Sequence, residues 1–300
     1  MVDIKEYIKS QTGVYGAWKS AKEISTFKGG GQAFVFYPQS VEKAVELIDV
    51  LGEENVDFSM LGNGSNTLVC DGNCRQVLVC LKGLCGVKID GEKVVCEGGA
   101  SVAKITFEGR KRGLGGLEFL SGVPCTLGGA LKMNAGAFSS QIGDYVTKID
   151  ILNIDCANCD KNRTQNRIRE ISVNSKDLAY RKGVDGIVLK AELKLAKKSG
   201  EQSVNEAREY LRKRQEKQPS LPSLGSVFKN GKIPSGKLID DCGLKGVKIG
   251  GAQVSQKHAN FIVNVGGASA KDYLTLASLC KKEVFEKFGI LLEEEFVTIE

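Results

Sequence analysis

The sequence feature that most constrains the fold of this chain is a glycine-rich stretch, Gly113–Phe138, which reads GLGGLEFLSGVPCTLGGALKMNAGAF. Glycine adopts positive φ angles in tight turns, and it lets a backbone approach a flat or anionic group closely. Leucine, valine, phenylalanine and methionine lie between the glycines, so the stretch is not a flexible linker. Two structures remain open from these residues alone: a glycine-lined wall for a ligand, and a close crossing of a strand and a helix in an ordinary core.

Bulk composition and charge narrow the functional classes. A chain of 300 residues can form two domains, or two and a smaller third, each with its own core. The net charge of +6 favours an anionic small ligand but is too low to indicate nucleic-acid binding. The sequence contains no run of about 18 apolar residues and no apolar signal-peptide core near its N-terminus. We therefore expect a cytoplasmic protein that binds neither nucleic acid nor a membrane.

Ten cysteines need an explanation in such a chain. In a reducing compartment, cysteines are mostly free thiols that pack as small apolar side chains. Cys156 and Cys159 form the only Cys-x-x-Cys pair, and His258 is the only histidine, so the spacing does not support a zinc site. We therefore expect no bound metal.

A second glycine loop, Gly62-Asn63-Gly64-Ser65-Asn66, follows a run typical of a β-strand. A dinucleotide fingerprint of the Rossmann type needs a third glycine and a helix of several turns after it. Here the chain instead leads through a turn into another predicted strand, Gln76–Leu81. Successive backbone N–H groups, with Ser65 and Asn66 as additional donors, can still bind a phosphate. The loop therefore predicts a phosphate site outside the Rossmann class.

Local capping signals predict three helices. A serine stands before each apolar stripe, in the position of an N-cap. The last of the three also has an aspartate three residues after the serine, which forms a capping box, and a glycine at its end. The three helices run from Ser40 to Leu51, from Ser101 to near Gly113, and from Ser269 to Gly289.

Alternating apolar residues predict strands elsewhere. Ile187–Leu195 alternates cleanly, and Val87–Cys96 is expected to form a hairpin turned at Asp90-Gly91. Residues 196–204 (AKKSGEQSV) show neither pattern and are expected to be a linker. A helix with one cationic face is expected over Arg208–Lys217.

Six motifs occur in an order that resembles the UDP-N-acetylenolpyruvoylglucosamine reductases, the flavin enzymes that complete UDP-N-acetylmuramic acid for bacterial peptidoglycan. The match runs from about Thr26 to the C-terminus, and the compact C-terminal part is more similar to the shorter, second type of the family. Any single motif is weak, whereas six in order over nearly the whole chain are specific. They are Thr26-Phe27 with Gly30-Gly31 and Ala33; Leu61–Asn66; Gly116–Gly122 continuing to Met133–Ala137; Tyr180-Arg181; Pro222-Ser223 with Gly225–Asn230; and Gly250–Ser255.

This resemblance implies a fold and a domain division. The expected class is α+β, with an FAD-binding fold of the PCMH/FAD-linked oxidase type in two α/β subdomains and a smaller α+β C-terminal substrate domain. The expected boundaries are 1–82, 83–197 and 198–300. The resemblance also implies non-covalently bound FAD, NADPH as co-substrate and a UDP-sugar substrate, and we expect a monomer.

The implied chemistry is reduction of an enol ether that bears a carboxylate, with protonation of the carbon next to that carboxylate. Arg181 would bind the carboxylate, Ser226 would donate the proton, and Glu295 would stabilise the enolate. From local sequence alone, each could be an ordinary surface or turn residue. Glu293 projects from the same face of the expected closing strand, so it remains an alternative to Glu295.

Binding residues follow from the resemblance as well. The two glycine loops would hold FAD, because small residues admit its pyrophosphate and its ring. Candidates for the substrate are Tyr180, Lys217, Asn230 and His258, and a hydrogen-bonded structural role is the alternative for the histidine. The candidates for FAD are Asn63, Gly64, Ser65, Asn66, Gly122, Thr126, Gly128, Gly129, Asn134, Ala135 and Gly136.

Three departures from the family pattern occur. Cys125 stands where glycine is usual, Gly183 stands where serine is expected after Tyr-Arg-x, and residues 293–296 read Glu-Glu-Glu-Phe where Glu-Pro-Glu-Val is common. Two other functions stay open: another FAD-linked oxidase or dehydrogenase of the same fold, and a non-catalytic flavin-binding module. Many of those oxidases attach flavin through a histidine in the N-terminal part, which this chain lacks because its only histidine is His258.

Overall fold

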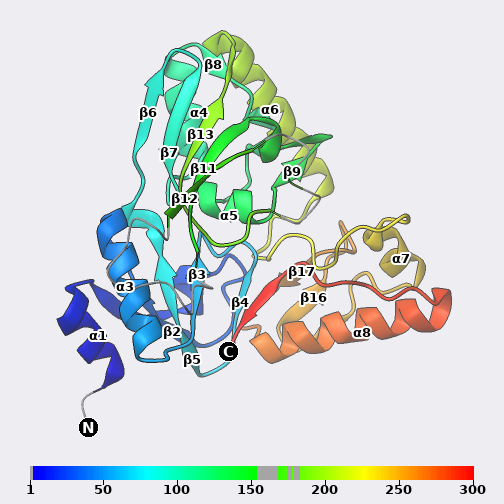
Figure 1. Ribbon diagram of the computed structural model, residues 1–300. Coiled ribbons are helices and arrows are strands. Elements are labelled where there is room, and N and C mark those ends of the chain that lie inside the picture. Colours follow the sequence, from blue (N-terminus) through cyan, green and yellow to red (C-terminus); the bar gives the residue numbers. More distant parts are fainter. Residues whose placement is uncertain (1–2, 154–167, 174–177, 179–182) are drawn as a thin grey trace. The chain divides into compact units, whose positions relative to one another are not determined.

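The computed structural model describes residues 3–153, 168–173, 178 and 183–300 (Figure 1). The chain divides into two compact units. No helix within the described residues is long and apolar enough to cross a membrane. The three-part division expected from the sequence stays a prediction. Unit 1 comprises Met1–Gly16, Phe36–Gly62 and Val79–Arg212, and unit 2 comprises Ala17–Val35, Asn63–Leu78 and Lys213–Glu300.

Unit 1 is built on a five-stranded sheet of order β12-β11-β13-β7-β6, in which all neighbours are antiparallel. The central strand is buried without alternation over Ile187–Leu189, and the predicted alternation holds only from Ala191 onward, where Ala191 and Leu193 join a core of valine, leucine and isoleucine. The strands are β6 Val87–Asp90, β7 Lys93–Glu97, β11 Val146–Leu152, β12 Ile168–Ser172 and β13 Ile187–Lys194.

Unit 1 also contains helices and short elements. Helix α5 packs against β13 and β7, and β8 pairs with β14. Helix α6 begins in unit 1, and its last turns belong to unit 2. The elements are α1 Ile4–Thr12, α3 Val41–Glu53, β3 Phe58–Leu61, η1 Leu81–Gly83, α4 Val102–Lys111, β8 Leu114–Gly115, η2 Glu118–Leu120, α5 Leu127–Lys132, β9 Gly136–Ala137, β10 Ser140–Gln141, η3 Ile142–Asp144, β14 Ala196–Lys197 and α6 Gly200–Lys217.

Unit 2 combines a small antiparallel sheet, β15-β16-β17, with the long helix α8, which packs on it. Strand β18 pairs in parallel with β4, and β1, β2 and β5 are successive neighbours in a further sheet. The elements are β1 Gly16–Ser20, α2 Ala21–Ile24, β2 Gln32–Phe36, β4 Thr67–Val69, β5 Asn73–Cys80, α7 Ser235–Asp241, β15 Lys248–Ile249, β16 Ala252–Val254, β17 Ile262–Asn264, α8 Ala270–Phe288 and β18 Val297–Ile299.

The three helices predicted from capping signals are confirmed. Ser40, Ser101 and Ser269 each accept a backbone hydrogen bond as the N-cap of α3, α4 and α8. The capping box of α8 forms with Asp272, and Gly289 ends the helix with a φ of 65°. These signals succeed because a cap depends on residues within one turn of the helix end.

The predicted hairpin is confirmed, but its turn lies one residue later than expected. Asp90 pairs with Lys93, so the turn residues are Gly91 and Glu92. Only Gly91 of these two has a positive φ, 56°, which fits a turn with glycine at the first central position.

The expected linker at residues 196–204 is wrong. Its first residues form β14, and α6 begins at Gly200. Ser199 and Gln202 exchange hydrogen bonds at 3.1 and 3.2 Å, which caps the helix. The segment resembled a linker because it is polar and has no apolar stripe. Its polar residues instead cap the helix and bind buried polar groups.

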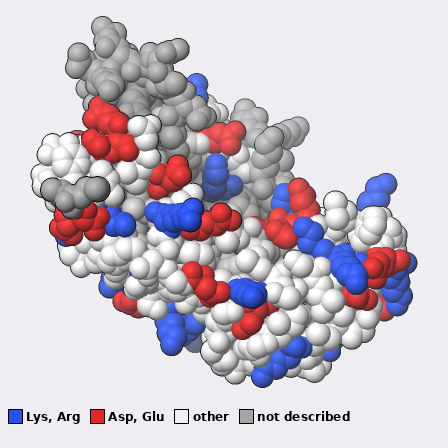
Figure 2. All heavy atoms as spheres, turned by 90° about the horizontal axis from the view of Figure 1, so that it is seen from below, with Lys and Arg blue, Asp and Glu red and all other residues white. Residues whose placement is uncertain are grey.

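Basic and acidic side chains are interspersed over the face shown in Figure 2. On that face, the net positive charge of the chain is not gathered into one cationic patch.

Candidate functional site

The glycine-rich stretch Gly113–Phe138 folds around α5 in unit 1. Thr126 caps this helix by accepting a hydrogen bond from the Gly129 N–H at 3.3 Å. The Gly128 N–H donates to the Gly98 carbonyl at 2.8 Å, and a Cβ at Gly128 would lie 3.1 Å from the same oxygen. At Gly128 the close crossing of a helix and a strand is therefore the correct interpretation.

Other glycines of this stretch leave backbone accessible instead. Gly122, which has a φ of 82°, and Gly129 are both exposed. Apart from its chain neighbours and the backbone of its own helix, a Cβ added at Gly129 would meet only Thr126 Oγ1, at 3.3 Å, among the described residues. An exposed backbone without side chains is the surface that a flat ligand needs. At Gly122 and Gly129 the interpretation as a wall for a ligand therefore stays a prediction.

The first glycine loop begins beside the same helix cap. A Cβ added at Gly62 would lie 2.9 Å from Thr126 Oγ1. In unit 2, Gly64 has a φ of 66°, and a Cβ there would collide with the backbone carbonyl of Ile24. Only glycine fits at Gly64, because backbone atoms cannot turn aside as a flexible side chain can.

Asn134, a candidate cofactor residue, has a side chain committed within unit 1. Its Nδ2 donates to Gln141 Oε1 at 2.9 Å and to the Leu178 carbonyl at 3.1 Å, and its Oδ1 accepts from the Gly143 N–H at 3.1 Å. The residue is buried and has a φ of 40°. These bonds fix the chain after α5 and use both N–H bonds of the Asn134 amide.

Unit 2 brings the segments of three candidate residues together. The Glu295 N–H donates to the Val227 carbonyl at 2.8 Å, and Phe228 forms an antiparallel bridge with Glu294. Ser226 therefore lies on the segment next to Glu295. Asn66 Nδ2 donates to the Glu295 carbonyl at 2.8 Å. Hydrogen bonds thus join the first glycine loop to the segments that contain Ser226 and Glu295. We call this group the array.

Asn260 supports this array, and sequence reasoning missed it. Its side chain accepts from the Phe228 N–H at 2.9 Å and donates to the Phe228 carbonyl at 2.8 Å, while its carbonyl accepts from the Val227 N–H. Asn260 is 1% exposed. A buried asparagine whose amide oxygen and nitrogen bind the N–H and the carbonyl of the same residue fixes the backbone beside Ser226.

The two alternative glutamates differ in environment. The Glu293 side chain is 74% exposed and forms an ion pair with Lys229 at 3.2 Å. Glu295 is half-buried, and its Oε2 atom is shielded from solvent. The expected closing strand begins only at Val297, after both glutamates. The geometry favours Glu295 as the functional acid, because a group that acts on a substrate in a water-poor site needs such shielding.

Comparison with known proteins identifies the family. Residues 32–155 match the sequence model of an FAD binding domain, and residues 216–299 match that of the UDP-N-acetylenolpyruvoylglucosamine reductase C-terminal domain. A curated UDP-N-acetylenolpyruvoylglucosamine reductase from Caldanaerobacter subterraneus subsp. tengcongensis is 41% identical over 281 residues, which cover 91% of this chain and 90% of the relative. The chain belongs to this reductase family.

Two further comparisons extend the match over nearly the whole reductase. The reductase from Bacillus subtilis is 37% identical over 302 residues, covering 97% of this chain and 96% of the relative. The crystal structure of the MurB reductase from Thermus caldophilus aligns with a TM-score of 0.77 at 29% identity, covering 96% of this chain and all of that one. The predicted α+β fold with an FAD-binding domain and a C-terminal domain is confirmed, and the chain is an FAD-dependent oxidoreductase.

The described residues fit FAD as the cofactor of this reductase. Gly122 and Gly129 offer exposed backbone in unit 1, and Gly64 holds the first loop in a conformation open only to glycine. Asn63, Ser65 and Asn66 are partly exposed beside Gly64. These groups supply the close backbone approach and the polar donors that a dinucleotide requires.

Two of the predicted residues, Tyr180 and Arg181, lie outside the described residues, as do Cys156 and Cys159. Gly183, one of the departures from the family pattern, is described: its N–H donates to the Lys132 carbonyl at 3.1 Å, and a Cβ there would collide with the end of α5. In this structure a serine at that position would clash with the helix.

The other substrate candidates lie in unit 2. Asn230 Oδ1 accepts from the Ser235 N–H at 3.1 Å, and Lys217 ends α6. His258 is part-buried, and its Nδ1 accepts from the Asn260 N–H at 3.2 Å. Burial, together with the charge of Lys245, lowers the pKa of His258, so its imidazole is neutral at pH 7. These contacts agree with the structural alternative for the histidine.

Two buried ionisable side chains were not among the predicted site residues. Tyr273 lies on the apolar face of α8 with its ring against Phe27 and Phe296, and its hydroxyl has no hydrogen-bond partner among the described residues. Burial, with the charges of Glu294 and Glu295, raises the pKa of this phenol. The second is Glu118, inside the glycine-rich stretch, which is 1% exposed. A single acid within an apolar run was the signal that could have found it.

Proposed function

We propose that this reductase converts UDP-N-acetylglucosamine enolpyruvate to UDP-N-acetylmuramate with NADPH as electron donor, and that it works as a cytoplasmic monomer. Family membership supports the substrate class. The observation that carries the proposal is the array in unit 2. Asn66 binds the Glu295 carbonyl at 2.8 Å, and Glu295 binds Val227, the neighbour of Ser226, at 2.8 Å.

Bound FAD, after reduction by NADPH, supplies a hydride to the β-carbon of the enolpyruvyl group. The Ser226 hydroxyl donates a proton to the adjacent carbon. The guanidinium of Arg181 binds the substrate carboxylate with two hydrogen bonds and stabilises the enolate. The Glu295 carboxyl group, when protonated, donates a hydrogen bond to the same developing charge. The roles of Ser226, Arg181 and Glu295 rest on the family resemblance of their motifs.

Binding of the two nucleotides is divided among the remaining candidates. The loops Asn63–Asn66 and Gly122–Gly136 hold FAD through backbone N–H groups and exposed glycines. Tyr180, Lys217 and Asn230 hold the UDP-sugar. The backbone geometry of Gly64 and the exposure of Gly129 support the first assignment.

The test is an anaerobic titration followed by the visible absorption of the flavin. NADPH should bleach the purified holoenzyme, and the enolpyruvyl sugar should then restore the oxidised spectrum. An NADPH-bleached flavin that does not recover on addition of the sugar would remove the assignment. A related FAD-linked oxidase would instead be reoxidised by oxygen while ignoring the sugar.

Substitutions at the proton donor and at the carboxylate-binding residue separate an enzyme from a flavin-binding module. Ser226→Ala and Arg181→Ala should each retain FAD and lose turnover by roughly 100-fold, because each removes one electrostatic or proton-transfer group. The exposed Ser220→Ala is the matched control and should keep wild-type turnover. Unchanged turnover in all three variants would remove the proposed roles of Ser226 and Arg181, whereas a wild-type holoprotein that binds FAD but shows no turnover would support the module.

A further inference from the structure

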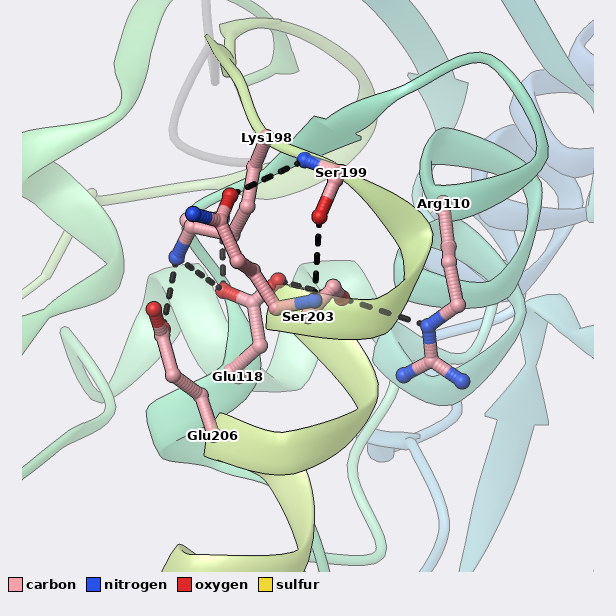
Figure 3. Close-up of polar contacts among 8 residues, drawn as sticks. Arg110, Glu118, Lys198, Ser199, Ser203 and Glu206 are labelled. Atoms are coloured by element: carbon pink, nitrogen blue, oxygen red, sulfur yellow. Dashed lines mark hydrogen bonds and ion pairs between the residues drawn. The ribbon is translucent and has the colours of Figure 1, made fainter.

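A buried carboxylate stands within the glycine-rich stretch and takes no part in the proposed chemistry. Figure 3 shows the Glu118 carboxylate surrounded by donors from neighbouring elements. Ser203 Oγ donates to its Oε1 at 2.6 Å, and the Gly116 N–H donates to its Oε2 at 2.7 Å. Lys198 Nζ lies 3.3 Å from the same Oε2. A carboxylate that is 1% exposed can remain ionised only with such partners.

The network extends through two more charged side chains. Lys198 also forms an ion pair with Glu206 at 2.6 Å, and Arg110 Nε donates to Ser203 Oγ at 3.2 Å. Burial alone would raise the pKa of Glu118, but the hydrogen bonds from Ser203 and the backbone, with the charge of Lys198, bring it below the ordinary value. Glu118 is therefore an anion at neutral pH.

These partners come from elements that are distant in sequence but all lie in unit 1. Lys198 follows β14, which pairs with β8 at the entry to the glycine-rich stretch. Ser203 lies in the first turns of α6, and Arg110 lies near the end of α4. The Glu118 carboxylate thus connects two parts of unit 1 by hydrogen bonds. One part is the turn at Gly116 together with η2, and the other is the beginning of helix α6.

The backbone around Glu118 is shaped to admit the charge. A Cβ at Gly115 would lie 2.5 Å from Glu118 Oε1, and Gly116 has a φ of 142°. Buried ion pairs add little net stability compared with apolar packing, so the network contributes chiefly to orientation. The oriented segment is adjacent to the candidate FAD loop: the Ser121 N–H donates to the Glu118 carbonyl at 2.9 Å, and Gly122 follows.

We propose that Glu118 is a positioning residue for FAD: its ionised carboxylate, bound to Ser203 and Lys198, holds the backbone that leads into Gly122 in the conformation that binds the cofactor. The inference rests on the proposed contact between FAD and Gly122–Gly136. It adds a role for α6, which supplies the hydroxyl that meets the carboxylate. Glu118 acts through the loop and touches neither the substrate nor the reacting atoms.

The test compares Glu118→Gln with Glu206→Gln. Glu206 is the matched control because it binds the same Lys198 ammonium from a position that is 44% exposed. FAD is removed, and its dissociation constant is measured for each apoprotein by quenching of flavin fluorescence. We expect Glu118→Gln to weaken FAD binding about tenfold, the range in which a network substitution alters coupling between sites. Glu206→Gln should change it by less than about twofold.

Two further measurements distinguish positioning from general stability. At saturating FAD, the kcat of Glu118→Gln should stay within about twofold of wild type, since the residue does not contact the substrate. The fine structure of the bound-flavin absorption band should change in Glu118→Gln and not in Glu206→Gln. Equal FAD affinities in the two variants, or a loss of kcat at saturating FAD with unchanged FAD affinity, would overturn the proposal.

A second variant covers the case in which Glu118→Gln does not fold. Ser203→Ala removes one donor and should weaken FAD binding about threefold, whereas unchanged affinity would count against the network. The outcome is separable from the proposed function. If the wild-type protein cannot bind FAD, the proposed function and the role of Glu118 both fail. If the wild-type protein turns over substrate but neither Glu118→Gln nor Ser203→Ala changes its FAD affinity, only the role of Glu118 fails.

Discussion

Two glutamates, Glu118 in unit 1 and Glu295 in unit 2, are held in opposite ways. At Glu118 the side chain is bound, because three groups donate to its carboxylate. At Glu295 the backbone is bound: its N–H donates to Val227 and its carbonyl accepts from Asn66. Neither of these two bonds uses the Glu295 carboxyl group. A carboxylate bound by several donors fixes structure through the side chain, whereas the backbone hydrogen bonds of Glu295 fix the position of the residue itself.

The largest expected effect separates Glu295 from its exposed neighbour. Glu295→Gln should lower kcat on the order of 100-fold, the usual cost of one electrostatic group at a developing charge. Glu293→Gln should lower it by less than about twofold, because that side chain is 74% exposed. Steady-state rates are compared at equal flavin content. Similar losses in both variants would mean that shielding does not distinguish the two acids.

A second effect tests whether the backbone around Glu295 depends on Asn260. Asn260→Ala should reduce the free energy of unfolding by about 2 kcal/mol, because the buried N–H and carbonyl of Phe228 lose their partner. Asn230→Ala removes one accepted bond near the surface and should cost about 1 kcal/mol or less. Urea unfolding of both proteins checks the difference. An equal cost for the two would show that Asn260 does not hold this backbone.

We expect low pH to remove the contribution of Glu118 to the stability of the folded protein. Because the folded pKa of Glu118 lies below its unfolded value, its stabilisation is complete above the unfolded pKa, about 4.3, and is lost as the pH falls through the folded pKa. The charged and titratable groups around it are Lys198, Glu206, Arg110 and Tyr145.

The midpoint of thermal unfolding, measured against pH, checks this expectation. Wild type should lose stability below about pH 4 more steeply than Glu118→Gln, which has no carboxylate to protonate at that site. Parallel curves for the two proteins would show that Glu118 does not contribute to acid sensitivity.

The smallest effect concerns the phenol beside Glu295. Tyr273→Phe removes a buried hydroxyl that has no hydrogen-bond partner among the described residues, so it should leave stability unchanged or raise it by up to about 1 kcal/mol. Urea unfolding measures this. A loss of more than about 1 kcal/mol would show that the hydroxyl has a partner in solution.

The features predicted correctly from sequence are local. The caps at Ser40, Ser101 and Ser269 and the alternation in the second half of β13 depend on neighbours within one helical turn or one strand. The order of the family motifs also lies in the sequence, and it led to the reductase family and to FAD. The error at residues 196–204 arose because a helix cap and a half-buried cation resemble a polar linker in composition.

The tertiary structure decided which polar groups meet. Ser203 and Glu118 are 85 residues apart, and Asn66 and Glu295 are 229 apart. Capping and alternation carry no information about such pairs, because a buried polar side chain finds its partner only when the chain packs. For the same reason the sequence left Glu293 and Glu295 equivalent, and packing shielded one carboxyl group while leaving the other in solvent.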